Sequence, residues 1–299
     1  MHTFDNEYSI VKLLPDFEDA LKWLEKYNIN VHNSRMGLYL KEIKKLVQLK
    51  SVDGLEAIAT ASDILFEAIE ILEIWSAFKN YHGSGLDARL QKALYGKNLR
   101  RDEPSQGSKE RDFTFELWMN ARISKAKYNV NLKDDADVRA TQGNLEIFIE
   151  CKRPISDDVS VLLRKAFKQL QKKYENNNTI KFRGYVAITF ERLCNPKNKL
   201  QIVENLAEAR SLLFGTVNVI EKSHHSLFES QNKYVHGILT IIRAPLFIKE
   251  GSLLICGSWI SVSNTRQLSE VEEAELTSFT NSLDENAVSH FFHQSESLL

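Results

Sequence analysis

The sequence predicts an α/β protein with a mixed central sheet and an all-helical N-terminal region, on the basis of three observations. Through the first hundred residues, apolar side chains recur at three and four steps, which is typical of helices with one buried face. After a linker rich in Gly, Ser and charged residues, short segments separated by turn residues indicate a β-hairpin. Residues 184–190 then form a continuous apolar run, as expected for a strand buried on both faces.

The N-terminal region is expected to consist of helices. The recurrence of apolar residues places them at 8–27, 34–49 and 55–81. Pro15 marks either a break in the first of these helices or a fresh start. Because broad apolar stripes usually pack in a core, we expect residues 1–100 to form a helical domain that packs on itself or on the next domain.

The segment 82–108 is expected to hold the domain boundary. It contains two groups of helix-breaking residues, Gly83-Ser84-Gly85 and Pro104-Ser105-Gln106-Gly107-Ser108, on either side of a short helical piece. The remainder of the chain, residues 101–299, is assigned to the second domain.

The second domain is expected to begin with a helix, a hairpin of strands and another helix. The predicted elements are a helix at 110–127, strands at 129–133, 136–140 and 145–153, a helix from 156 to 174, a strand at 184–190, a helix at 202–213, strands at 234–242 and 253–262, and a helix at 270–283. Pro154 ends the third strand because proline cannot continue a hydrogen-bonded ladder.

The hairpin is predicted to bring charged side chains onto one face of the sheet. Side chains alternate along a strand, so Glu150 and Lys152 point the same way. A turn centred on Gln142 and Gly143 would set Asp137 opposite Phe148 and diagonal to Glu150. A shift of this register by one residue would separate the two carboxylates.

Two carboxylates and an ammonium on one face suggest a site for a hard cation. Magnesium prefers oxygen ligands and keeps several waters, so Asp137, Glu150 and the main-chain carbonyl of Cys151 could hold it. Lys152 would then orient a water nucleophile and stabilise charge on phosphoryl oxygens. Glu116 could reach the same site from the preceding helix. The Cys151 side chain should point to the opposite, apolar face as a core thiol.

This helix, hairpin and Glu-x-Lys strand resemble the PD-(D/E)xK phosphodiesterase superfamily, the fold of many restriction enzymes and Holliday-junction nucleases. The resemblance covers roughly residues 110–190. It matches Glu116, Asp137 and Glu150-Cys151-Lys152 to the residues of the family motif. The chain departs from the motif at Ala136, where the family has proline. Asp134 and Asp135 are close enough that the assignment of the metal ligand could shift to one of them.

The resemblance implies a restriction-endonuclease-like αβββαβ core that hydrolyses nucleic-acid phosphodiesters with Mg²⁺, for which Mn²⁺ can substitute, and with DNA as the usual substrate. It also implies a supporting glutamine on the helix after the motif, for which Gln169 is the first choice and Gln171 the second. A small helical domain joined to such a core further resembles bacterial restriction and phage-defence nucleases.

The formal net charge of −1 conceals an uneven distribution along the chain. Residues 81–199 hold 24 Lys and Arg against 15 Asp and Glu, whereas both ends are acidic. Binding to a phosphate backbone requires such a concentration of cations. The predicted nucleic-acid contacts are Arg153, Arg164, Lys165, Lys168 and Lys172.

Other features concern location and partners. No run approaches the ~18 consecutive apolar residues of a membrane helix, and the acidic start is unlike a signal peptide, so we expect no membrane association. Three cysteines without close spacing fit a reducing cytoplasm. The helical domain could recruit a partner protein, and a homodimer is also possible. The alternative to an enzyme is a catalytically silent nuclease-fold module that binds nucleic acid or assembles with a partner.

Overall fold

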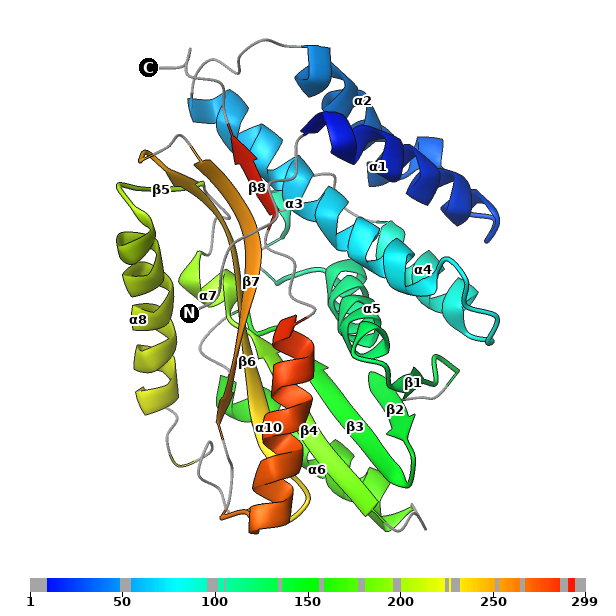
Figure 1. Cartoon of the computed structure of the whole chain (residues 1–299), viewed down its shortest axis with the longest axis vertical. Helices are drawn as coiled ribbons and strands as arrows, with labels where there is room; N and C mark the ends of the chain where they lie inside the picture. The colour runs from blue at the N-terminus through cyan, green and yellow to red at the C-terminus, as the bar shows by residue number, and fades with distance from the viewer. Residues whose placement is uncertain are drawn as a thin grey trace.

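The computed structural model describes residues 10–48, 55–95, 102–104, 106–133, 136–155, 159–176, 181–195, 200–223, 226, 232–250, 253–263, 267–285 and 290–293. Within these residues the protein is of the α/β class, with a mixed sheet covered by helices (Figure 1). The predicted class is therefore confirmed. None of the helices in these ranges is long and apolar enough to cross a membrane.

The sheet has eight strands, in the order β1-β2-β3-β4-β6-β7-β8, with β5 paired to β6 beside this path. Their bounds are β1 Asn129–Val130, β2 Val138–Gln142, β3 Leu145–Lys152, β4 Lys181–Thr189, β5 Gln201–Val203, β6 Gly237–Ile248, β7 Leu253–Ser263 and β8 His290–His293. Strands β3, β4 and β6 are parallel, whereas β1 to β3 and β6 to β8 form antiparallel meanders. The two kinds of pairing make the sheet mixed, as predicted.

Helices lie on both faces of the sheet (Figure 1). Their bounds are α1 Ile10–Glu25, α2 Arg35–Gln48, α3 Leu55–Phe78, α4 Leu86–Leu94, α5 Lys109–Lys125, α6 Val159–Glu175, α7 Glu191–Cys194, α8 Leu206–Ser223 and α10 Glu270–Glu285, and a 3-10 turn spans Val31–Asn33. Helix α1 begins at Ile10 and continues through Pro15, so neither the break nor the fresh start expected at Pro15 occurs. The helix expected at 202–213 begins later, after the short strand β5, and runs further.

Two layers of apolar side chains separate the sheet from its helices. One layer joins residues of α1 to α5 and α10 to one face of the sheet, including Ile149 of β3 and Leu239 of β6. The other joins α6 and α8 to the opposite face, including Phe148 and Ile238. The N-terminal helices thus share a core with the sheet, which favours the second of the two packing arrangements expected for them.

The hairpin of β2 and β3 differs from its predicted register. Val138 pairs with Ile149 and Gln142 with Leu145, so the loop consists of Gly143 and Asn144. Gly143 has a φ of 60°. In a two-residue hairpin loop, the first loop residue often has a positive φ, which glycine adopts without strain. The predicted turn would have placed Gln142 at this position, whereas the observed turn places Gly143 there. The register is therefore shifted by two residues, which preserves the face on which each side chain lies.

Helix α5 ends in a left-handed residue that is not glycine. Lys127 has a φ of 66°, and its amide donates to Ser124 while that of Tyr128 donates to Ile123. These two hydrogen bonds close the helix and turn the chain into β1. The strand expected at 129–133 is correspondingly short.

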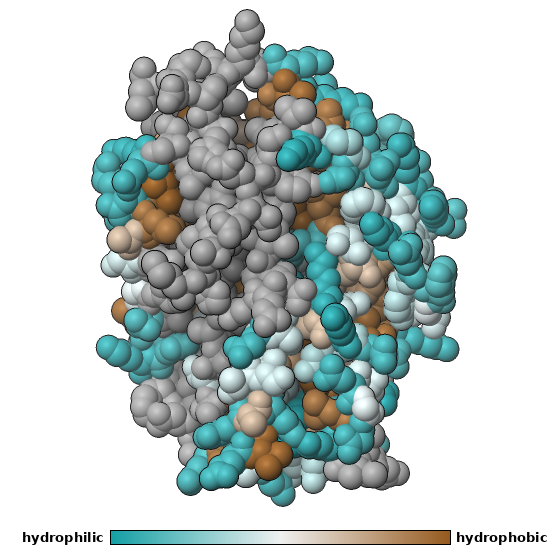
Figure 2. Space-filling view, viewed as in Figure 1, coloured by the Kyte–Doolittle hydropathy of each residue, from teal (hydrophilic) through white to brown (hydrophobic). Residues whose placement is uncertain are grey.

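On the face shown in Figure 2, hydrophilic side chains cover most of the described surface, and hydrophobic residues form separate small patches. The buried apolar clusters of the described residues lie between the sheet and its helices.

Candidate active site

Strand β3 carries two of the predicted site residues into a buried position. Glu150 and Lys152 point to the face of the sheet that α6 covers, beside Val186 and Ile188 of β4. Glu150 is 2% exposed and Lys152 is 9% exposed. Charged groups buried to this extent require partners, because an unpaired charge in an apolar environment is strongly destabilising.

Asp137 lies next to these two residues. The register of β2 and β3, continued by one residue, sets Asp137 opposite Glu150 and not opposite Phe148 as expected. Its Oδ2 accepts a hydrogen bond of 2.7 Å from the amide of Cys151. This bond holds the carboxylate against the strand that carries the other two residues.

Lys152 joins the two carboxylates. Its Nζ lies 3.0 Å from Glu150 Oε2 and 3.3 Å from Asp137 Oδ2, and it donates to the main-chain oxygen of Cys151 at 3.0 Å. We call Asp137, Glu150 and Lys152 the carboxylate–lysine cluster. Burial lowers the pKa of the Lys152 ammonium, but the charges of Asp137 and Glu150 outweigh burial and raise that pKa overall.

Glu116 contributes a third carboxyl group from α5. Burial and the charge of Asp137 raise the pKa of Glu116 to about 8, although Arg89 and Lys152 act in the opposite direction. It forms an ion pair with Arg89, whose Nη1 lies 3.7 Å from Glu116 Oε2. Burial and the charge of Asp137 likewise raise the pKa of Glu150 to about 7. Burial, together with the charge of Asp137, therefore makes both glutamates hold their protons to a higher pH than usual.

The oxygen atoms of this site are of the kind that could serve a divalent cation. Carboxylate oxygens of Asp137 and Glu150 and the carbonyl of Cys151 are hard ligands, and a bound cation would offset the burial and the Asp137 charge that raise the pKa values of Glu116 and Glu150. Among the described residues, no group of three or more His, Cys, Asp and Glu side chains is placed to hold a metal ion. Two carboxylates with water completing the shell match magnesium better than zinc.

Cys151 has the role of a core residue. Its thiol belongs to the apolar layer on the opposite face from Glu150, and burial raises the thiol pKa well above its ordinary value. A neutral, buried thiol is a poor nucleophile. Only its main-chain carbonyl remains as a candidate metal ligand.

The assignment of Arg153 to nucleic-acid contact is wrong. Its side chain is 2% exposed and its guanidinium forms two hydrogen bonds of 2.6 Å with Glu103 and one of 2.8 Å with Glu191. Arg192 also approaches Glu103, at 3.5 Å. Arg153 therefore fixes the end of β3 to the segment before α5 and to α7, and it cannot reach a phosphate at the surface.

The other four predicted contacts lie on α6. Arg164, Lys165, Lys168 and Lys172 are all exposed, and none forms an ion pair with another described residue. They recur along the side of the helix that faces away from the sheet. A polyanion could contact these basic side chains there.

Gln169 lies on the same helix between the exposed and buried sides. Its Oε1 is buried and has no hydrogen-bond partner among the described residues, so the structure does not join it to the carboxylate–lysine cluster. A supporting role for Gln169 stays a prediction. Asp134 and Asp135, the alternative ligands, lie outside the described residues.

Two residues of the site had not been predicted. Arg89 of α4 donates to three main-chain carbonyls around Asp137, and Asn120 of α5 donates to the carbonyl of Asp137. Asn120 follows Glu116 by one helical turn on a buried face. A polar residue at such a position needs a hydrogen-bond partner, and this requirement indicates from the sequence that Asn120 belongs near the site. Arg89 is 48 positions away from Asp137, and no local pattern indicates such a contact.

Comparison with known proteins found no matching protein family, no matching curated protein and no matching solved structure.

Proposed function

We propose that this protein is a metal-dependent nuclease that hydrolyses phosphodiester bonds of nucleic acid, with DNA as its substrate. The observation that carries the proposal is the carboxylate–lysine cluster, in which Lys152 lies within 3.3 Å of both carboxylates. The order of elements around it, α5-β1-β2-β3-α6-β4, supports the proposal because it is the order expected for the PD-(D/E)xK core. A setting in bacterial restriction or phage defence rests on the same resemblance.

Each residue of the cluster would have a separate task. Asp137, Glu150 and the Cys151 carbonyl would hold Mg²⁺ or Mn²⁺, and the ion would supply Lewis acidity toward the phosphoryl group. The Lys152 ammonium would orient the attacking water and stabilise negative charge on the phosphoryl oxygens. Glu116 has a pKa of about 8, so it can hold or release a proton near neutral pH.

Substrate would reach this site along α6. The exposed side chains Arg164, Lys165, Lys168 and Lys172 offer phosphate contacts, and α6 begins shortly after the strand that carries Lys152. Contacts of this kind position a nucleic-acid backbone without reading its sequence.

The proposal is tested by cleavage of single-stranded, double-stranded and branched DNA and RNA with Mg²⁺, with Mn²⁺ and with a chelator. We expect cleavage of DNA that depends on the metal. Asp137→Ala and Lys152→Ala should each lower the rate by at least ~10²-fold, as loss of an electrostatic catalytic group does. Glu175→Gln, which changes an exposed carboxylate at the end of α6, is the control. Equal cleavage by all four proteins would exclude the assignment.

A second candidate is a catalytically silent module that binds nucleic acid or a partner protein. The observation that favours it is the ammonium of Lys152, which already bonds to Glu150 and could replace a metal as the counter-ion. Titration calorimetry with Mn²⁺ separates the two. Heat of binding that disappears in Glu150→Ala supports the enzyme, and no detectable binding by the wild type supports the silent module.

A further inference from the structure

The segment that brings Asp137 into the carboxylate–lysine cluster is held by an arginine from the N-terminal region. Arg89 lies on α4 and donates from Nε to the carbonyl of Leu132 at 2.9 Å, from Nη2 to Ala136 at 2.8 Å and from Nη1 to Asp137 at 3.1 Å. A guanidinium presents its donors in a rigid planar fork, so one side chain can bind three carbonyls at once. A lysine has the same charge but cannot reproduce that geometry.

A second side chain binds the same main-chain oxygen. Asn120 is fully buried, and its Nδ2 donates to the carbonyl of Asp137 at 2.8 Å and to that of Glu116 at 2.9 Å. The carbonyl of Asp137 thus accepts from both Arg89 and Asn120, which uses both of its lone pairs. The main chain of Asp137 is fixed to α4 and α5, while its carboxylate is fixed to β3 through the amide of Cys151.

We infer that Arg89 and Asn120 are positioning residues for the metal ligand Asp137, and that α4 therefore completes the site. The inference rests on the proposed function, because it concerns the same cluster. Groups that orient a metal ligand change metal affinity by about 10–100-fold when they are removed. The N-terminal region would then contribute directly to the chemistry and would not serve only to recruit a partner.

An electrostatic role and a positioning role for Arg89 predict opposite changes in the affinity for a divalent cation. The guanidinium is a cation close to the site, so a purely electrostatic role means that its removal strengthens the binding of a divalent cation. A positioning role means that its removal weakens binding, and that Arg89→Lys weakens it too although the charge is kept. The sign of the change in affinity therefore identifies the role.

The test is calorimetric titration of the full-length protein with Mn²⁺. We expect Arg89→Ala and Arg89→Lys to lower the affinity by about 10–100-fold. Lys92→Ala removes an exposed cation from the same helix and should change the affinity by less than about 2-fold, since exposed charges are screened. Asn120→Ala should also weaken binding. If that variant does not fold, the two Arg89 variants decide the question alone.

Hydrogen–deuterium exchange separates failure of this inference from failure of the proposed function. Without metal, Arg89→Ala should accelerate amide exchange in residues 136–142, whereas Lys92→Ala should not. If the wild type neither binds Mn²⁺ nor cleaves DNA, the proposed function fails, and the exchange result still tests whether Arg89 holds this segment. Unchanged exchange in Arg89→Ala, or an affinity for Mn²⁺ that is equal or higher, would overturn the inference.

Discussion

The carboxyl groups around Lys152 are buried and lie close to one another, and burial is the larger influence on their protonation. Glu150 and Glu116 have pKa values raised to about 7 and about 8, first by burial and then by the charge of Asp137. At neutral pH the folded protein therefore retains protons that the unfolded chain would release. Both raised pKa values arise because the fold buries the carboxyl groups and places them beside Asp137, so their ionisation is unfavourable unless a cation compensates it.

Glu116→Gln should stabilise the protein at alkaline pH. The pKa of Glu116 is near 4.5 in the unfolded chain and about 8 in the folded protein. The free energy of unfolding therefore falls as the pH rises between these two values, because the folded state must then give up a proton that it holds more tightly. The amide cannot ionise, so at pH 8.5 the variant should exceed the wild type by on the order of 1–3 kcal/mol in free energy of unfolding. At pH 4 the difference should be small, because both side chains are neutral. Urea denaturation at the two pH values, in chelator, measures it.

Glu175→Gln provides the matched control, because Glu175 is exposed and should give no difference at either pH. A stability gain of Glu116→Gln that is the same at pH 4 and pH 8.5 would contradict the explanation, since it would then arise from packing and not from ionisation.

At the scale of elements, the end of β3 carries side chains that belong to two separate charged networks. Lys152 faces the cluster, whereas its neighbour Arg153 is bonded to Glu103 and Glu191. The sequence predicts the charges of this strand and the face of each side chain, because alternation is a local property. It does not predict that Arg153 is buried, since its partners are 50 and 38 positions away along the chain. Composition alone could not separate it from the exposed cations of α6.

Arg153→Ala and Arg164→Ala should therefore have different effects. Removing Arg153 takes away a buried cation that is bonded to two buried carboxylates, Glu103 and Glu191, and should cost about 3–5 kcal/mol of free energy of unfolding. Removing Arg164 from the exposed side of α6 should change stability by less than about 0.5 kcal/mol. It should instead weaken nucleic-acid binding and reduce the slope of log affinity against log salt concentration by about 1. Denaturant titration and binding at several salt concentrations measure the two effects, and similar stability losses for both would refute the distinction.

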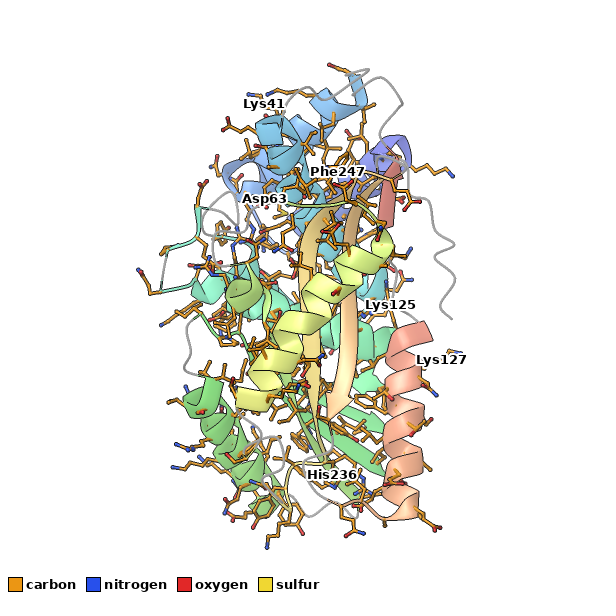
Figure 3. All side chains as sticks on the ribbon, turned by 90° about the vertical axis from the view of Figure 1, so that its left-hand side faces the viewer. Lys41, Asp63, Lys125, Lys127, His236 and Phe247 are labelled. Atoms are coloured by element: carbon orange, nitrogen blue, oxygen red, sulfur yellow. The ribbon has the colours of Figure 1, made fainter. Side chains whose placement is uncertain are left out.

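The end of α5 allows a second test at this scale. Lys127 is exposed and has a left-handed conformation. Figure 3 shows Lys125 and Lys127 near α10, at the end of α5. A side chain in that conformation is strained by its Cβ, and glycine is not. Lys127→Gly should raise the free energy of unfolding by about 0.5–1 kcal/mol. Lys127→Ala removes the same charge but retains Cβ, so in thermal denaturation it should show no gain, and equal gains in both variants would assign the effect to charge.

At the scale of the whole molecule, the N-terminal helices and the sheet are connected by both apolar and charged contacts. Apolar residues from Leu13 of α1 to Leu283 of α10 form one continuous layer. Arg35 of α2 pairs with Glu67 of α3 at 3.0 Å, and Glu67 in turn contacts Arg111 of α5. The sequence predicts the helices by their periodicity and the sheet by its hairpin. It leaves their packing open, because an apolar stripe does not specify the surface that covers it.

This packing predicts that residues 1–100 and residues 101–299 do not unfold independently of each other. A chain whose N-terminal helices share the sheet's core should unfold in a single cooperative transition, because removal of either part exposes the apolar layer of the other. Residues 101–299 alone would also lack Arg89, so we expect them to aggregate or to melt without a cooperative transition. Calorimetry of the full chain and circular dichroism of the fragment measure this. Two separate transitions in the full chain, together with a cooperatively folding fragment, would show that the regions are independent domains and that α4 only rests against the site.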